Sequence, residues 1–279
     1  MKTPSDIQTI VITGSTRGIG LGLAHAFADA GQQVVISGRS QETVDAVVAD
    51  LQSLFPEHAA GFACDVTRRE DVDALWDFAA ARFGRVDIWI NNAGISHEQA
   101  PVYALPSDQM RAVNETNIIG TLYGVHTAVR GMLNQGGGTV YNLEGLGSDG
   151  RKVEGLGVYG STKCCIKYLN DSLIDELKGS TVRIGAIQPG MVLTDMLIGE
   201  NRRAHPNWES SRRIFNILAD RVDVVAPWIV RQVLCNTKHG KRIRRMSAWT
   251  AAWRFFSYPF TKRDVISSLL DTDAEGESI

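Results

Sequence analysis

Hydrophobic and polar positions change their period repeatedly along this chain, from short apolar runs to stretches with apolar residues three or four positions apart. The short runs are rich in β-branched residues and predict strands at 9–14, 33–38, 60–66, 86–94, 138–145 and 182–190. The stretches between and after them predict helices at 19–31, 40–55, 68–83, 107–134, 157–178 and 224–235. Because strands alternate with helices and are apolar on both faces, the pattern favours an α/β fold with a doubly wound parallel sheet.

Composition and charge narrow the class of protein. The 279 residues are 44% hydrophobic with a net charge of −2, so no global charge attracts the chain to nucleic acid or anionic membranes. The N-terminus shows no leader and no apolar run is long enough to span a bilayer, which predicts a cytoplasmic or already processed protein. The cysteines match no metal motif and predict buried thiols in a reducing compartment, at Cys64, Cys164, Cys165 and Cys235.

A glycine-rich loop, TGSTRGIG, follows the first strand and opens the first helix. Its glycines let the backbone turn tightly and approach a pyrophosphate at the positive end of the helix. In this strand–loop–helix context the loop predicts a dinucleotide site. Its candidate cofactor-binding residues are Gly14, Ser15, Thr16, Arg17, Gly18, Ile19 and Gly20.

The end of the second strand indicates which dinucleotide binds. An acidic residue there would accept hydrogen bonds from the ribose hydroxyls, but the chain has Gly38, followed by Arg39 and Ser40. Arg17, in the glycine loop, can reach the same region. Two guanidinium groups without a carboxylate suit a 2′-phosphate, so the sequence predicts NADP(H). The alternative is that both arginines are solvated surface residues.

Two further strand ends complete the predicted cofactor site. The segment CDV ends the third strand and would place Asp65 and Val66 beside the adenine. The segment NNAG ends the fourth strand, where Asn92, Ala93 and Gly94 would lie along the nicotinamide ribose. Since the carboxyl ends of parallel strands share one edge of the sheet, we expect these pieces to come together.

The segments TGSTRGIG, NNAG, YGSTK and PGMVLTD, in this order and spacing, resemble the short-chain dehydrogenase/reductase family over roughly residues 8–235. The resemblance implies a Rossmann fold and hydride transfer between a nicotinamide and a carbonyl or alcohol carbon. It also implies homodimers or homotetramers built through two long helices. In the last segment it implies that the carboxamide side of the nicotinamide is bound by Pro189, Gly190, Val192 and Thr194.

Tyr159 and Lys163 stand four positions apart, on one face of a predicted helix. A phenol with an ordinary pKa of about 10 is a poor acid–base group at neutral pH, and a nearby ammonium favours the phenolate. In a reduction Tyr159 would donate a proton to the developing alkoxide as hydride arrives from the nicotinamide. The resemblance implies that Lys163 also holds the ribose hydroxyls and that Asn117 supports a water chain to it. Asn114 competes for that last role, but Asn117 has the glycine that follows three positions later in the family.

The catalytic serine usual in the family is missing from the end of the fifth strand. Here the chain reads YNLEGLGSDG, with Gly145 or Leu146 at the position that the resemblance assigns to the serine. Ser148 is the nearest hydroxyl and is the candidate catalytic substitute. Glu144 could polarise the site instead, although a carboxylate beside a developing alkoxide would repel it unless protonated.

The missing serine makes the resemblance more specific, because it points to one branch of the family. The altered strand end, combined with YGSTKC and QPGMVLTDML, is similar to the chlorophyll b reductase branch. That branch uses NADPH to reduce the 7-formyl group of chlorophyll b to hydroxymethyl, which implies an apolar carbonyl compound as substrate here. The alternatives are a short-chain enzyme acting on a steroid, a lipid or an acyl thioester, and a non-catalytic NADP-binding protein.

We expect a single domain over 1–237 and a C-terminal extension over 238–279. Within the domain, residues 196–223 would close over the substrate in this fold. Core packing is the alternative for each apolar residue of that segment. The expected apolar lid comprises Met196, Leu197, Ile198, Trp208, Ile214 and Phe215.

The extension begins with the basic run KHGKRIRRM, and its apolar residues recur at helical steps as far as Phe260. This pattern predicts an amphipathic helix over 238–260. We expect the helix to pack on its own domain or on a partner subunit, and peripheral contact with a membrane surface is the alternative. The acidic overall balance and the aromatic face disfavour nucleic acid as a partner. The last residues, DTDAEGESI, predict a solvated acidic tail.

Overall fold

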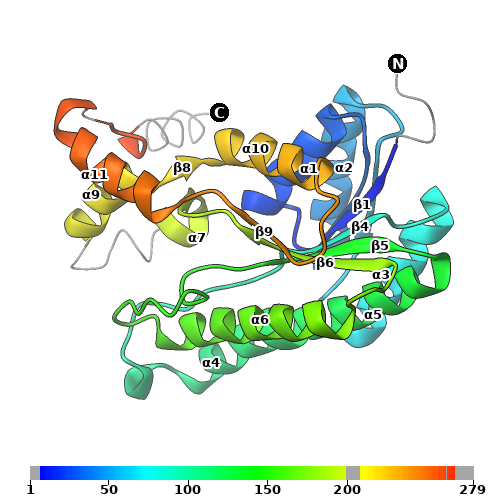
Figure 1. The fold of residues 1–279 in the computed structure, drawn as a ribbon, viewed down its shortest axis with the longest axis horizontal. Helices are drawn as coiled ribbons and strands as arrows, with labels where there is room; N and C mark the ends of the chain where they lie inside the picture. The colour runs from blue at the N-terminus through cyan, green and yellow to red at the C-terminus, as the bar shows by residue number, and fades with distance from the viewer. Residues whose placement is uncertain (1–6, 199–207, 262, 268–279) are drawn as a thin grey trace.

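Seven strands form one sheet in the order β3-β2-β1-β4-β5-β6-β9, which confirms the predicted doubly wound α/β fold (Figure 1). A computed structural model of the chain describes residues 7–198, 208–261 and 263–267. All neighbouring strands of this sheet run parallel, so their carboxyl ends share one edge. The strands are β1 (Thr9–Ile12), β2 (Gln33–Gly38), β3 (Ala59–Ala63), β4 (Ile88–Asn91), β5 (Gly138–Leu143), β6 (Val182–Gln188) and β9 (Lys241–Arg244).

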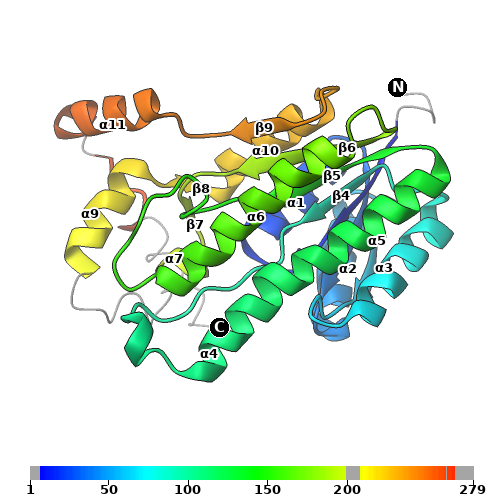
Figure 2. The same cartoon turned by 60° about the horizontal axis from the view of Figure 1, so that its bottom comes forward.

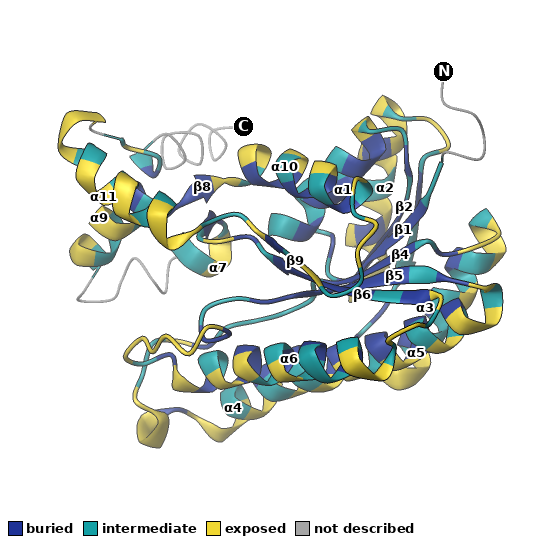
Figure 3. Cartoon of the chain, in the orientation of Figure 1, coloured by how far each residue is buried: buried dark blue, intermediate teal, exposed yellow. Residues whose placement is uncertain are grey.

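Helices cover both faces of the sheet, as Figures 1 and 2 show from two directions. Their buried sides face the sheet and their exposed sides face outward (Figure 3). One face carries α1 (Gly18–Asp29), α2 (Gln41–Leu54) and α10 (Val222–Leu234). The other carries α3 (Arg69–Phe83), α5 (Gly120–Gln135) and α6 (Gly157–Glu176). Ser40 caps α2, as predicted, by accepting a hydrogen bond from the backbone N of Thr43 at 3.4 Å.

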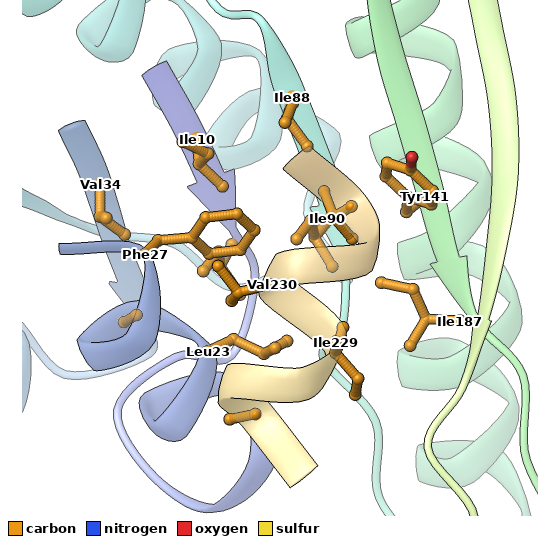
Figure 4. Close-up of a cluster of buried hydrophobic side chains, with 14 of the residues drawn as sticks. Ile10, Leu23, Phe27, Val34, Ile88, Ile90, Tyr141, Ile187, Ile229 and Val230 are labelled. Carbon is orange, nitrogen blue, oxygen red and sulfur yellow. The ribbon is translucent and has the colours of Figure 1, made fainter. Parts of the chain in front are cut away.

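Each face of the sheet has its own hydrophobic core. In the core shown in Figure 4, Leu23 and Phe27 of α1 lie beside Ile229 and Val230 of α10, over the strands. The opposite core is built around Trp89, which is fully buried between the sheet and the helices α3 and α5. Burial on both sides explains why the central strands read as continuous apolar runs.

The long helix predicted over 107–134 is interrupted. It consists of α4 (Ser107–Asn114), a π-helical turn (Glu115–Ile119) and α5. A π-helical turn widens the backbone by one residue and frequently occurs at functional sites. Here it directs Asn117 inward, where the residue is 1% exposed.

The prediction that the C-terminal helix begins at residue 238 is wrong. Residues Lys241–Arg244 form β9, the edge strand, which pairs with β6. Ile243 is buried against the sheet, whereas Lys241 and Arg244 are exposed. The strand was not predicted because a run of basic residues with one apolar side chain lacks the alternation typical of a strand. The sheet therefore extends past residue 237, where we expected the domain to end. The helix itself is α11 (Ala248–Thr261).

Beyond the carboxyl end of β6, a smaller group of elements projects from the sheet, at the left in Figure 1. It comprises a second sheet of β7 (Val192–Leu193) and β8 (Asp220–Arg221), with α7 (Asp195–Ile198), α9 (Trp208–Leu218) and α11. Leu197, Ile198, Trp208 and Phe215 of the expected lid pack in its core. Met196 and Ile214 are each 42% exposed. The lid residues 199–207 lie outside the described part of the chain.

The burial of the cysteines differs from the prediction. Of the cysteines expected to be buried, Cys64 is buried, but Cys164 and Cys235 are exposed and Cys165 is half-buried. Cys164 is on α6, and its thiol donates a hydrogen bond to the carbonyl of Gly147 at 2.7 Å. No helix within the described residues is both long and apolar enough to cross a membrane.

Candidate active site

The glycine loop joins β1 to α1 at the carboxyl edge of the sheet. Thr13 fixes the loop to the end of β4, because its Oγ1 accepts hydrogen bonds from the backbone N of Asn92 and of Ala93, both at 3.0 Å. The Asn92 side chain donates to the carbonyls of Thr13 and Gly14 at 2.8 and 2.9 Å. The loop and NNAG therefore form one rigid unit. Thr13 is a positioning residue that the sequence motifs did not single out.

Two glycines in this loop are required by close packing. Gly14 has φ +63°, and a Cβ there would lie 2.9 Å from the Cα of Ala93. A Cβ at Gly20 would lie 2.4 Å from the carbonyl oxygen of Gly14. The bare backbone that results leaves a cradle in which a phosphate can approach the start of α1, so the loop fits the predicted dinucleotide. Ile19 follows at the first turn of α1 and packs against the core.

Ser15 is placed differently from its neighbours in the loop. Its hydroxyl donates to the carbonyl of Ile12 at 2.8 Å and accepts from the backbone N of Ser37 at 2.9 Å. Its own backbone N donates to the carbonyl of Ser37 at 2.8 Å. Ser15 is fully buried, and its polar atoms join β1 to β2.

Of the predicted 2′-phosphate residues, Arg39 and Ser40 directly follow β2, and Arg17 follows Thr16 in the glycine loop. Arg17, Arg39 and Ser40 are exposed, and neither arginine makes an ion pair with a described residue. A Cβ at Gly38 would lie 2.7 Å from Cγ2 of Thr16. An aspartate at position 38 would therefore collide with Thr16, so the loop sequence and the missing carboxylate are sterically linked.

The end of β3 supplies Asp65 and Val66. One oxygen of Asp65 accepts hydrogen bonds from the backbone N and the hydroxyl of Thr67, at 3.0 and 2.8 Å. Val66 is 7% exposed and packs against Gly120, where a Cβ would lie 2.7 Å away. The turn before α3 is thus fixed close to the start of α5.

Tyr159 and Lys163 occupy the first turns of α6, beside the end of β5. The Lys163 Nζ lies 5.8 Å from the centre of the Tyr159 ring and donates to the carbonyl of Leu143 at 3.3 Å. Burial lowers the pKa of Lys163 to about 8, and the negative charge of Glu144 acts in the opposite direction. A cation beside the phenol favours phenolate, so the pair has the arrangement of a proton donor with its charge partner.

Asn117 belongs to this cluster and Asn114 does not. The Asn117 amide exchanges two hydrogen bonds with the backbone of Ile95, at 2.9 and 3.0 Å. A Cβ at Gly94 would lie 3.3 Å from Asn117 Oδ1 and 3.7 Å from Lys163 Nζ, so the three residues converge. The Asn114 amide instead donates to the carbonyl of Met110 on its own helix, at 2.8 Å.

His97 and Thr162 also position α6, although the sequence motifs gave no reason to select either. The backbone N of Tyr159 donates to Nε2 of His97 at 3.2 Å, while Nδ1 lies 2.6 Å from the carbonyl of Glu98. These partners require the tautomer protonated at Nδ1. The hydroxyl of Thr162 donates to the carbonyl of Tyr159 at 2.7 Å and accepts from the Asn117 amide at 3.1 Å.

At the end of β5 the structure places the backbone of Gly145 next to the phenol. A Cβ at Gly145 would lie 3.1 Å from Tyr159 Oη and 3.5 Å from Lys163 Cε. The hydroxyl of Ser148 donates to the carbonyl of Gly145 at 2.6 Å, within the same turn. Glu144 is 1% exposed, and its carboxylate accepts hydrogen bonds from Asn170, Gln188 and Arg242.

The segment PGMVLTD closes the site from the side of β6. Pro189 is buried, Gly190 has φ +81°, and Val192 is 4% exposed in β7. A Cβ at Gly18 would lie 3.5 Å from the Thr194 methyl, so this segment faces the glycine loop directly. The predicted residues form a continuous edge from the glycine loop, through NNAG, to the tyrosine and lysine.

Comparison with known proteins agrees with this arrangement. A family model described as short chain dehydrogenase matches residues 8–205. The chain is 38% identical over 230 residues to chlorophyll(ide) b reductase NOL of Oryza sativa subsp. japonica, covering 80% of this chain and 66% of that protein. It is 32% identical over 257 residues to the probable chlorophyll(ide) b reductase NYC1 of Arabidopsis thaliana, covering 86% of this chain and 51% of that protein. The chain thus spans between about half and two thirds of the length of these relatives.

The fold is also similar to that of solved enzymes. The structure of ElxO with NADP bound superposes with a TM-score of 0.75 and 25% identity, covering 85% of this chain and 96% of that one. The chain that binds NADP in that structure therefore shares nearly its whole fold with the protein described here.

Proposed function

Because this chain belongs to the short chain dehydrogenase family, we propose that it is an NADPH-dependent reductase of a carbonyl group on a bulky apolar substrate. The observation that carries the proposal is the Tyr159 hydroxyl beside the bare backbone of Gly145, with Lys163 behind the ring. The similarity to proteins named chlorophyll(ide) b reductase makes the 7-formyl group of chlorophyll b our preferred substrate.

Each residue of the cluster has a separate part in the proposed reaction. Tyr159 donates its phenolic proton to the carbonyl oxygen as that oxygen gains negative charge. Lys163, held by the Leu143 carbonyl, keeps a positive charge near the phenol and binds the ribose hydroxyls. Asn117 fixes the backbone after NNAG and supports a water chain to Lys163. The nicotinamide, when bound, supplies the hydride.

Gly145 accounts for how a large substrate can reach the phenol. A serine at this position would place its Cβ 3.1 Å from the Tyr159 hydroxyl, in the space that a carbonyl group on a wide ring system needs. Ser148, the candidate substitute for the missing hydroxyl, fixes the turn that carries Gly145. To donate to the substrate carbonyl, Ser148 has to give up its hydrogen bond to the Gly145 carbonyl.

The preference for NADPH is supported by the packing at the end of β2. An aspartate at position 38, which would bind a free ribose 2′-hydroxyl, requires the Thr16 side chain to move, because its Cβ would lie 2.7 Å from Thr16 Cγ2. Arg17 and Arg39 are exposed, and each guanidinium can bind a 2′-phosphate bidentately. We therefore assign the 2′-phosphate to these two arginines.

We also propose a homodimer or homotetramer in the cytoplasm that touches a membrane surface through α11. The stripe of Trp249, Trp253, Phe256 and Phe260 is 66–86% exposed. The opposite side of α11 is fixed by Arg254, which donates to both carboxylate oxygens of buried Asp220. The aromatic side chains therefore face outward, as in an interfacial helix. Co-sedimentation with anionic vesicles tests this, comparing Trp253→Ser with Tyr168→Ser, which removes an exposed aromatic residue from α6.

The first experiment on function is an assay of the purified protein with NADPH and chlorophyll b in detergent. Formation of the 7-hydroxymethyl product is followed by absorbance and chromatography, with NADH and Tyr159→Phe as controls. Turnover that requires both NADPH and Tyr159 supports the proposal. NADPH binding without turnover of any formyl tetrapyrrole overturns the preferred substrate. Activity on a panel of steroid, lipid and acyl thioester ketones would then identify the substrate class.

A further inference from the structure

A series of buried side-chain hydrogen bonds runs from β4 through β5 to α6 and ends at Glu144. Trp89 Nε1 donates to Asn91 Oδ1, Asn91 Nδ2 donates to Asn142 Oδ1, and Asn142 Nδ2 donates to Asn170 Oδ1, each at 2.7 Å. Asn170 Nδ2 then donates to Glu144 Oε1 at 3.0 Å. The three asparagines are 0–6% exposed. Each of these buried amides has a hydrogen-bond partner on both its oxygen and its nitrogen.

The donor-to-acceptor direction of these hydrogen bonds is set by the groups at both ends of the series. The Trp89 indole can only donate, so the Asn91 oxygen must accept from it. At the other end an ionised carboxylate can only accept, so the Asn170 NH₂ group must face Glu144. Every amide between them therefore points its NH₂ group toward Glu144. Such a series of aligned donors favours negative charge at its final acceptor.

The Glu144 carboxylate has two more donors besides Asn170. The Gln188 amide of β6 donates to Oε2, and Arg242 Nε of β9 donates to Oε1 at 3.3 Å. Arg242 also pairs with Asp171 on the surface of α6. A buried carboxylate with three donors, one of them a guanidinium, has the partners that an anion needs to remain charged away from water.

Lys163 lies close to this anion but is not paired with it directly. Its Nζ donates to the carbonyl of Leu143, the residue immediately before Glu144 in the chain. Lys163 and Asn170 are seven positions apart on α6 and face the same strand. Among the described residues, the charged or titratable groups facing Lys163 include Tyr159 on its own helix and Glu144 after β5, and Arg242 links Glu144 to Asp171.

We propose that Glu144 is a positioning residue whose buried carboxylate keeps Lys163 protonated beside Tyr159, and that the asparagine chain and Arg242 hold this anion in place. The inference rests on the proposed function for the role of Lys163. Burial alone favours the neutral amine, and the negative charge of Glu144 opposes this effect. The strand end has thus lost a hydroxyl at Gly145 and carries a carboxylate at the preceding position.

The test measures the protonation of Lys163 directly and needs no substrate. The protein is labelled with ¹³C-lysine, the Cε signal of Lys163 is assigned with Lys163→Met, and its titration is followed in the unliganded protein. Glu144→Gln should move the titration of Lys163 to lower pH. Arg242→Gln should move it to higher pH, because the cation that partly neutralises Glu144 is gone. These opposite shifts keep the test decisive if one variant does not fold.

Asp171→Asn is the matched control, because it also deprives Arg242 of a carboxylate partner but leaves Glu144 intact. An unchanged titration of Lys163 in Glu144→Gln overturns the proposal, as does an equal shift in Asp171→Asn. Glu144→Asp should restore the wild-type titration if charge is what matters. A shift in Glu144→Gln without turnover of any carbonyl substrate would support the role of Glu144 and count against the proposed function alone.

Where turnover is measurable, the pH profile gives a second readout. Glu144→Gln should move the alkaline limb of kcat/KM to lower pH by roughly one pH unit, lowering kcat/KM about twofold at pH 7 and about tenfold at pH 9. A merely structural role would lower the whole profile without moving the limb, and that result would contradict the proposal.

Discussion

Replacing Lys163 by methionine is expected to stabilise the unliganded protein at pH 7 while removing turnover. Burial lowers the pKa of the Lys163 ammonium from 10.5 to about 8, even with Glu144 opposing the change. A fall of that size means that the folded state disfavours the cation by about 3 kcal/mol relative to the unfolded chain. Methionine is of similar length and uncharged, so it avoids this cost. Loss of the hydrogen bond to Leu143 offsets about 1 kcal/mol, leaving a net gain of about 2 kcal/mol.

The pH dependence of this gain follows from the same two pKa values. Below about pH 8, Lys163 is protonated in both the folded and the unfolded chain, so its cost is constant. Between about pH 8 and 10.5 the unfolded chain holds a proton that the folded chain has lost. Because stability rises with pH wherever the unfolded state binds more protons, Lys163 makes the wild type progressively more stable over this window. The advantage of Lys163→Met should therefore shrink above pH 8.

Urea denaturation followed by circular dichroism, without cofactor, measures this difference between pH 6.5 and 9.5. Comparing two proteins that differ at one residue removes from the difference the contribution of ionisable groups that do not interact with Lys163. Lys167→Met, which removes a lysine from the exposed ion pair with Asp171, is the control and should show no pH-dependent gap. A gap between Lys163→Met and the wild type that is constant with pH would refute the reasoning, as would a destabilised variant at pH 7.

Three further predictions concern the residues around the phenol. Tyr159→Phe should lower kcat about 10²-fold or more and leave NADPH binding, measured by fluorescence, nearly unchanged; equal loss of both would contradict its role as proton donor. Gly145→Val should lower kcat/KM about tenfold or more, because even a Cβ would lie 3.1 Å from Tyr159 Oη, and a small aldehyde should be less affected. His97→Ala should reduce the free energy of unfolding by about 1 kcal/mol, since the backbone N of Tyr159 loses its acceptor, and His97→Gln should recover part of it.

The sequence predicted the sheet and its helices because local pattern and tertiary burial agree in them. Strands such as β1 and β6 are apolar on both faces, so their burial is visible in the residues themselves. The edge strand β9 was missed because its residues are mostly charged and one of them, Arg242, is directed at a buried partner. An ion pair formed between distant segments leaves no periodic trace in either segment.

Some residues of the candidate site could likewise be predicted from local motifs, and others only from the folded structure. The glycine loop, NNAG, Tyr159 and Lys163 could be selected because their chemistry depends on short spacings within a segment. His97 and Thr162 act through one hydrogen bond each to the backbone of Tyr159. His97 lies outside every motif, and Thr162 lies within YGSTK without an acid–base role of its own, so the part that each plays becomes visible only once the loop after β4 and the start of α6 are placed in space.

Glu144 shows why an isolated residue can suggest the wrong chemistry. Considered alone, a carboxylate next to the position of the missing serine should repel a developing alkoxide. In the folded chain, Glu144 shares with Asn142 the side of the β5 segment that faces Asn170, as alternation along an extended strand requires. Gly145, one position later, is the residue beside the phenol. The Glu144 carboxylate is therefore hydrogen-bonded to Asn170, Gln188 and Arg242, with Lys163 as the nearby cation, and Gly145 rather than Glu144 is the residue beside the Tyr159 hydroxyl.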